Sequence, residues 1–299
     1  MLMTMKELLA VAYENQFSIG AFNIGSGEIL RLVLETAEEE KSPVILEIHP
    51  DELEFLGDDF VVYCREMAKN AKVPVVIHLD HGADIHQVMR AIKCGFTSVM
   101  IDGSHYPYEE NIAVTKEVVA VAHDAGVSVE AELGTIGAIE GSFEAGSVSE
   151  VIYTSPEQAA DFIEKTGVDS LAIAIGTSHG IYPKNFKPEL KIELLKEIKA
   201  KTNIPLVLHG GSGTGDDNLQ KAVQTGIQKV NLFTDLSTAA LNAMVKYLDF
   251  DWNGMKQDGS KGEFGNLKAN LCDISIAAKN GFVESLEYYI KLFGSNGKS

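Results

Sequence analysis

The sequence predicts a single parallel (β/α)8 barrel with a C-terminal helical extension, forming one domain over residues 1–299. Eight short runs rich in Val, Ile and Leu alternate with longer amphipathic runs, which is the pattern of strands followed by covering helices. The apolar runs are mostly continuous, as expected of strands that are covered on both faces. The length of 299 residues fits one such barrel, since these typically take ~250 residues. A doubly wound open sheet is the alternative, and it would require a reversal of strand order.

The expected elements follow from these runs and from their boundary residues. Ser155 and Pro156 are a cap and a first helical residue, and glycines at 95, 126, 167 and 226 follow helical runs where a left-handed cap is expected. The expected strands lie at residues 18–23, 43–48, 73–79, 97–102, 127–132, 169–175, 204–209 and 228–233. The expected helices lie at residues 27–40, 58–71, 84–94, 108–125, 156–166, 189–201, 216–225 and 235–248.

Two segments interrupt the alternation. Residues 133–154 are long and rich in Gly, Ser and Glu, and a long loop after a barrel strand is a candidate lid over the catalytic face. Residues 249–265 are polar and precede a last expected helix at 267–293, so 249–299 is an atypical polar segment plus a C-terminal helix.

Composition excludes several classes of function. Lys plus Arg number 25 against 43 Asp plus Glu, which gives a net charge of −18. A protein this acidic does not attract nucleic acid or an anionic membrane through its overall field, so no partner of either kind is expected. No uncharged apolar run approaches the ~18 residues of a membrane span. The three widely spaced cysteines form no disulfide framework, so the expected location is the cytoplasm.

Histidines follow three of the expected strands. His81, His179 and His209 stand at the C-terminal ends of the third, sixth and seventh strands, and each precedes a glycine. The C-terminal ends of barrel strands converge on one mouth, so three imidazoles can meet there. Three histidine ligands with one open position are typical of catalytic Zn2+, and separate polar residues at strand ends are the alternative.

Carboxylates lie at the same mouth. Asp80 adjoins His81 and is a natural proton donor or acceptor, or alternatively a partner that orients His81. His78 faces the same way as Asp80 and is interpreted as a partner rather than a ligand. Asp102 and Glu132 could form a second metal position or simply add hydrogen bonds.

The last two strands supply a candidate phosphate site. Gly210, Gly211 and Ser212 follow the seventh strand, and Asn231 to Thr234 follow the eighth, just before a helix. Loops after these two strands are the usual phosphate site of a barrel, where backbone N–H groups hold the anion. Metal and phosphate together indicate metal-assisted chemistry on a phosphorylated small molecule, without separating aldol cleavage from isomerisation or hydrolysis.

Longer motifs narrow this choice. They are HLDHG (78–82), SVMIDGSHYPYEENI (98–112), GVSVEAELGTIGAIEG (126–141), GVDSLAIAIGTSHG (167–180), IPLVLHGGSG (204–213) and KVNLFTDL (229–236). With the N-terminal MKELLAVAYENQFSIGAFNI, the chain over about residues 5–245 resembles the class II, zinc-dependent fructose-bisphosphate and tagatose-bisphosphate aldolase family. The resemblance implies a carbohydrate-metabolism lyase, as in glycolysis, that reversibly cleaves a ketose bisphosphate to dihydroxyacetone phosphate and an aldehyde.

The resemblance also implies residue roles. His81, His179 and His209 would hold the zinc, and Asp102 and Glu132 would match a second divalent metal position. Asp80 would be the acid/base at the C4 hydroxyl, and Glu140 would remove the proton from dihydroxyacetone phosphate, although its loop alone indicates only a solvated side chain. The residues expected around the phosphate are Gly180, Gly210, Gly211, Ser212, Asn231, Phe233 and Thr234. A monovalent cation, Na+ or K+, is expected near the carbonyls of Gly180 and Gly210, and the assembly is expected to be a homodimer or homotetramer.

The sequence departs from the family pattern at two places. Family members commonly have Ser or Thr near the end of the second strand, where this chain has His49. They often bind the distal phosphate through a C-terminal Arg, and here no Arg follows Arg90. The identity of the aldehyde is therefore open. The alternatives are the same chemistry on another phosphorylated sugar or sugar acid, a non-catalytic sugar-phosphate-binding subunit, and a metal-dependent phosphohydrolase.

Overall fold

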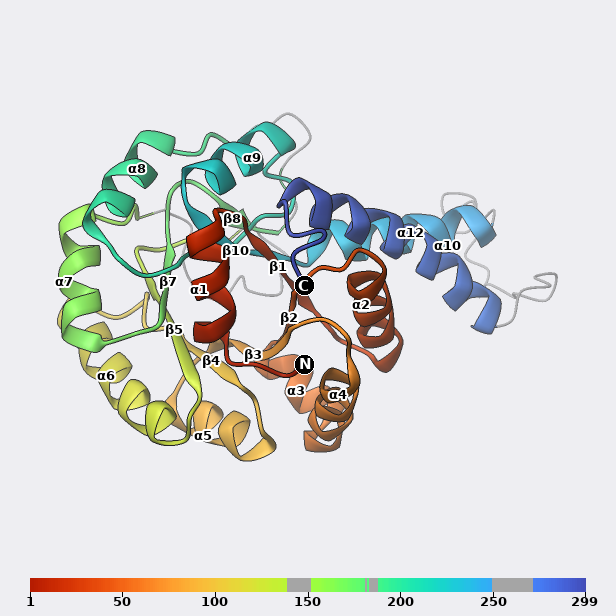
Figure 1. Ribbon diagram of the computed structural model, residues 1–299, viewed down its shortest axis with the longest axis horizontal. Coiled ribbons are helices and arrows are strands. Elements are labelled where there is room, and N and C mark those ends of the chain that lie inside the picture. The colour runs from red at the N-terminus through yellow and green to blue at the C-terminus, as the bar shows by residue number, and fades with distance from the viewer. Residues whose placement is uncertain (139–151, 181, 183–187, 249–270) are drawn as a thin grey trace, which may run out of the picture.

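The computed structural model describes residues 1–138, 152–180, 182, 188–248 and 271–299, and its centre is a closed barrel of parallel strands (Figure 1). The strand order is β1-β10-β9-β7-β5-β4-β3-β2, which confirms the predicted (β/α)8 barrel. The barrel strands are β1 (Ile19–Asn23), β2 (Val44–Ile48), β3 (Val75–Gly82), β4 (Ser98–Ile101), β5 (Ser128–Leu133), β7 (Ser170–Ile173), β9 (Leu206–Leu208) and β10 (Ile227–Leu232).

Helices surround this barrel and begin largely where the sequence predicts. Ser155 caps its helix through a bond from the Gln158 amide, and Gly167 ends the same helix with a φ of 73°. The helices are α1 (Met5–Asn15), α2 (Gly27–Glu39), α3 (Pro50–Leu56), α4 (Asp58–Asn70), α5 (Ile85–Cys94), α6 (Tyr108–Asp124), α7 (Pro156–Thr166), α8 (Ile192–Lys201), α9 (Asp216–Thr225), α10 (Thr234–Leu248) and α12 (Leu271–Leu292).

Two features were not predicted. The short helix α3 begins at Pro50, and its cap is His49, whose Nδ1 accepts a bond from the Asp51 amide at 3.3 Å. A small parallel pair, β6 (Gly137–Ala138) and β8 (Ser178–His179), lies outside the barrel sheet. Within the last predicted helix, the structure describes α12 from Leu271 to Leu292, while residues 267–270 lie outside the described residues.

The barrel interior changes character along its axis. At its N-terminal end, α1 packs Leu8 and Leu9 against a closed apolar layer that includes Ile45 and Val76. Two residues further along the strands, alternation brings Glu47 and His78 to the same inward side, and both are fully buried. The polar positions are therefore concentrated toward the C-terminal ends of the strands, where the site is expected.

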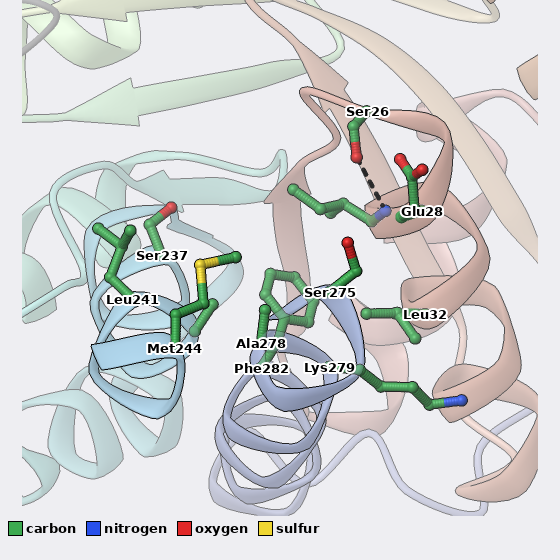
Figure 2. Close-up of a pocket in the computed structure, with 12 residues that line it drawn as sticks. Ser26, Glu28, Leu32, Ser237, Leu241, Met244, Ser275, Ala278, Lys279 and Phe282 are labelled. Carbon is green, nitrogen blue, oxygen red and sulfur yellow. Dashed lines mark hydrogen bonds between the residues drawn. The ribbon is translucent and has the colours of Figure 1, made fainter. Parts of the chain in front are cut away.

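Helices α10 and α12 lie side by side and extend away from the barrel (Figure 1). They approach closely at Gly281, where an added Cβ would lie 2.4 Å from the carbonyl oxygen of Ala239. A cavity of about 390 Å³ lies between this helix pair and α2. Figure 2 shows Leu241 and Met244 of α10 on one side of it and Leu32 of α2 on the other. Among the described helices, none has the combined length and apolar character needed to span a membrane.

Candidate active site and metal centre

The structure brings the three predicted histidines together. Ligand atoms of His81, His179 and His209 all lie within 4.8 Å of one another. The ring centroid of His81 is 5.2 Å from that of His179 and 4.7 Å from that of His209. His81 is the second-last residue of β3, His179 lies in β8, and His209 directly follows β9, so three separate strands position the cluster.

A local irregularity places two consecutive side chains of β3 at this site. The pairing of β3 with β4 shifts register between Leu79 and Gly82, and His81 has a φ of 46°. Such a left-handed residue typically costs about 1–3 kcal/mol and is retained where the surrounding structure requires it. In a regular strand, Asp80 and His81 would face opposite sides. Here Asp80 Oδ1 lies 3.9 Å from His81 Nε2.

Asp102 is the carboxylate that orients His81. Its Oδ2 lies 2.9 Å from His81 Nδ1, and its Oδ1 accepts a bond from the Ser104 amide at 3.0 Å. Burial alone would raise the pKa of Asp102, but the His81 contact and the Ser104 bonds hold it below its usual range. An ionised Asp102 at Nδ1 leaves Nε2 of His81 to face the cluster.

His209 is oriented in the same manner by Glu130. Its Nε2 lies 2.8 Å from Glu130 Oε1, and its Nδ1 lies 3.0 Å from His81 Nε2. Burial, followed by the charge of His81, holds the pKa of His209 well below its usual value. A neutral imidazole whose other nitrogen is held by a carboxylate is the form that binds metal. His81 and His209 therefore fit a metal centre in two respects: their positions in the cluster, and the carboxylate that each contacts through its other ring nitrogen.

A second group of donors adjoins the first. His81, Asp102 and Glu132 also place one ligand atom each within 4.8 Å of one another. Glu132 is buried, and its Oε2 has no hydrogen-bond partner. Burial and the neighbouring charge of Asp102 raise the pKa of Glu132 well above its usual value. An orphaned buried carboxylate oxygen beside an ionised carboxylate is what a second cation would satisfy.

Asp80 is buried and close to the proposed phosphate residues. Its Oδ1 accepts a bond from Asn231 Nδ2 at 3.2 Å, so side chains of β3 and β10 are in contact across the barrel. Asn231 Nδ2 also lies 3.4 Å from His209 Nδ1. Of the two predicted proton-transfer residues, only Asp80 can be placed, because Glu140 lies outside the described residues.

The glycine turn after β9 is closely packed. At Gly210, with a φ of 65°, an added Cβ would lie 2.8 Å from the Ser178 carbonyl oxygen, and at Gly211 it would lie 2.8 Å from the Asn231 carbonyl oxygen. Side chains are therefore excluded at both positions. Ser212 Oγ accepts a bond from the Asp235 amide at 3.2 Å, which ties the turn to the first turn of α10.

The remaining predicted phosphate residues are Gly180, Phe233 and Thr234. Thr234 is the first residue of α10, and Phe233 directly precedes it with 40% of its surface exposed. Gly180 follows His179 with a φ of 95°. His49 also lies near the cluster, and its ring centroid is 6.4 Å from that of His81.

Beneath the histidines lies a charged network that sequence reasoning missed. Lys229 Nζ lies 2.8 Å from Glu47 Oε1 and 2.9 Å from Glu130 Oε2, and all three side chains are fully buried. Burial alone would lower the pKa of Lys229, but Glu130 and Glu47 raise it above its usual value. One signal was available: each of these charged residues stands inside an apolar strand run, at a position that alternation directs inward.

His78 belongs to this buried layer. Its Nδ1 lies 2.8 Å from Ser98 Oγ and its Nε2 lies 3.7 Å from Glu130 Oε2. Burial, then the charge of Lys229, hold its pKa well below its usual value. His78 therefore packs as a neutral side chain beneath the cluster rather than within it.

Known proteins resemble this chain over nearly its full length. A family model described as "Fructose-bisphosphate aldolase class-II" matches residues 3–298. A fructose-bisphosphate aldolase of Staphylococcus epidermidis is 41% identical over 256 residues, covering 84% of this chain and 87% of that protein. One from Staphylococcus aureus has the same identity and coverage.

Solved structures agree with the fold. The YdjI aldolase of Escherichia coli K12 superposes with a TM-score of 0.81 at 35% identity, covering 100% of this chain and 99% of that chain. A fructose-bisphosphate aldolase of Campylobacter jejuni gives a TM-score of 0.79 at 26% identity, covering 100% and 97%.

Proposed function

This chain belongs to the class-II fructose-bisphosphate aldolase family, and on that premise we propose that it is a zinc-dependent aldolase that cleaves a ketose bisphosphate. The family makes it an enzyme and a carbon–carbon lyase. The proposed products are dihydroxyacetone phosphate and an aldehyde. The observation that supports this most directly is the cluster of His81, His179 and His209, in which two rings are already oriented by carboxylates.

The proposed zinc would be held by His81, His179 and His209. The donor set fits, because His81 Nε2 and His209 Nδ1 face each other while their other nitrogens contact Asp102 and Glu130. When bound, zinc supplies a Lewis acid that polarises the substrate carbonyl. The orphaned Glu132 oxygen supports a second divalent position shared with Asp102.

Proton transfers are assigned to two carboxylates. In the cleavage direction, the C4 hydroxyl gives its proton to Asp80 as the C3–C4 bond breaks, and Glu140 returns a proton to C3. Asp80 is buried beside the histidines, so water has little access to the proton that it carries. The bond from Asn231 to Asp80 limits rotation of the carboxylate, which supports this role.

The phosphate of the dihydroxyacetone half is assigned to the turn after β9 and to the start of α10. Ser212 Oγ accepts from the Asp235 amide, so its own hydroxyl proton can be donated to an anion. The proposed neighbours are Gly180, Gly210, Gly211, Asn231, Phe233 and Thr234. Carbonyl oxygens of Gly180 and Gly210 are the proposed ligands of a monovalent cation.

The aldehyde half is where this chain differs from its family's pattern. No arginine follows Arg90 in the sequence, and bidentate arginine is the strong choice for a distal phosphate. His49 lies 6.4 Å from His81 between ring centroids and is the proposed contact at this end. The aldehyde is therefore proposed to be bound weakly, or to be something other than glyceraldehyde 3-phosphate.

A panel of ketose mono- and bisphosphates tests the function. Release of dihydroxyacetone phosphate from at least one member is expected, whereas release of inorganic phosphate alone would indicate a phosphohydrolase. A kcat/KM for fructose 1,6-bisphosphate in the range of ~10⁴–10⁸ M⁻¹s⁻¹, well above every other sugar, would contradict the argument from the missing arginine. Low values across the panel would support it.

A further inference from the structure

Lys229 occupies a position that lysine rarely takes. It lies in the middle of β10, points into the barrel and is fully buried. Burying an ammonium group is costly unless charged partners surround it. Here Glu47 from β2 and Glu130 from β5 contact it at 2.8 and 2.9 Å. The lysine therefore joins three barrel strands at a single point.

The contacts of Glu130 lead from Lys229 to the histidine cluster. Lys229 Nζ donates to both oxygens of Glu130, at 3.1 Å to Oε1 and 2.9 Å to Oε2. The same Oε1 lies 2.8 Å from Nε2 of His209. A carboxylate held at both oxygens cannot rotate freely about its terminal bond, so its acceptor position toward His209 is fixed.

We propose that Lys229 is a positioning residue of the metal centre: by clamping the Glu130 carboxylate, it fixes the ring of His209 so that Nδ1 faces the metal. This inference rests on the proposed zinc function. Glu130 accepts from Nε2–H, which leaves the lone pair of Nδ1 directed toward His81 Nε2, 3.0 Å away. The link from Lys229 to His209 runs through Glu130, whose Oε1 lies 2.8 Å from His209 Nε2.

A purely structural role for Lys229 makes a different prediction. If the lysine only offsets buried charge, then losing Lys229 and losing the charge of Glu47 should affect zinc binding alike. If the lysine acts through Glu130, losing Lys229 should weaken zinc binding and losing the charge of Glu47 should not. Glu47 provides the matched control, because it contacts the same ammonium from β2 and belongs to the same buried layer.

The experiment measures zinc affinity by competition with a chromophoric chelator. Lys229→Met is expected to bind zinc about 10–100-fold more weakly than wild type, the usual effect of losing a partner that orients a metal ligand. Glu47→Gln leaves Lys229 on Glu130 and is expected to bind zinc as tightly as wild type. Equal zinc affinity in Lys229→Met and wild type would overturn the inference, as would equal losses in Lys229→Met and Glu47→Gln.

A double variant keeps the test decisive if Lys229→Met does not fold. Lys229→Met with Glu130→Gln removes one charge of each sign, and it is compared with Glu130→Gln alone. Since Lys229 acts through Glu130, the two should bind zinc equally weakly. A further tenfold loss in the double variant would contradict the inference. Failure of wild type to bind zinc would instead contradict the proposed function.

Discussion

The barrel interior and the α10–α12 pair handle their side chains in opposite ways. Inside the barrel, Lys229, Glu130 and His209 are fully buried and are linked in one chain of contacts. On the helix pair, large apolar side chains are exposed, including Leu241 at 58% and Leu271 at 83%. The interior buries charged side chains, whereas the helix pair carries large apolar side chains on the surface of the chain.

This difference separates the region of the proposed chemistry from a region that contributes to stability. The proposed metal, proton and phosphate contacts come from β3, β5, β8 and β10, from the turns after β4 and β9, from the loop that holds Glu140 and from Thr234, the first residue of α10. None of the residues proposed for these contacts belongs to α12. Changes to the proposed site residues inside the barrel should therefore lower catalysis, and changes at its rim should alter substrate preference. Changes in the helix pair beyond Thr234 should alter stability alone.

The largest effect is expected from removing a histidine of the cluster. His209→Ala should lose bound zinc and lower cleavage by at least about a thousandfold, because a Lewis-acid metal supplies several kcal/mol. Metal analysis together with the release of dihydroxyacetone phosphate measures both effects. His86, exposed on α5, gives the control, since His86→Ala should keep its zinc and its activity. Retention of zinc by His209→Ala would remove this residue from the ligand set.

The two proposed proton carriers should be separable. Asp80→Ala should lower cleavage by about 10²–10⁴-fold, the usual contribution of general acid–base catalysis. It should still exchange the dihydroxyacetone phosphate proton with solvent, whereas Glu140→Ala should lose that exchange. Proton exchange followed by NMR in deuterated water distinguishes the two. If Glu140→Ala exchanged as fast as wild type, it would not be the base.

A smaller effect is expected at the rim. His49→Asn keeps a side chain that can cap α3 but removes the imidazole beside His81. Cleavage should weaken by about three- to tenfold, the effect of one hydrogen bond. Zinc content should be unchanged because His49 is not a proposed ligand. Proton exchange should be unchanged because it involves only the dihydroxyacetone phosphate half of the substrate. Parallel losses of cleavage and exchange would place His49 in the chemistry instead of at the aldehyde end.

Beyond Thr234, the helix pair should respond only in stability. Gly281→Ala places a methyl group against the Ala239 backbone and should lower the free energy of unfolding by about 1–3 kcal/mol. Urea unfolding measures this change. Gly27→Ala on α2 is the matched control, since its added Cβ would lie at an ordinary 3.6 Å from Tyr63. A loss of zinc in Gly281→Ala would show that the helix pair affects the metal site inside the barrel, and it would contradict this separation.

Much of this molecule could be predicted from sequence because its elements are strongly patterned. Every barrel strand begins within two residues of its predicted start, since continuous apolar runs ended by polar residues leave little ambiguity. The convergence of three histidines followed from topology alone. The short helix α3 was missed because a single capped turn after a strand has too few residues to show a period.

What the sequence could not give were contacts between strands far apart in the chain. Lys229 and Glu130 are separated by 99 residues, and only barrel closure places them in contact. The register shift that turns both Asp80 and His81 toward the site also has no local signature, since it depends on how β3 pairs with β4.

Metal-dependent carbon–carbon cleavage is the central claim, and one measurement tests it most directly. The protein is treated with EDTA, its zinc content is determined, and the release of dihydroxyacetone phosphate is assayed on the best ketose bisphosphate before and after zinc is returned. Release should disappear with the zinc and recover with it, because the clustered histidines are proposed to hold a metal that the reaction requires. Undiminished release from protein shown to contain no metal would contradict the account.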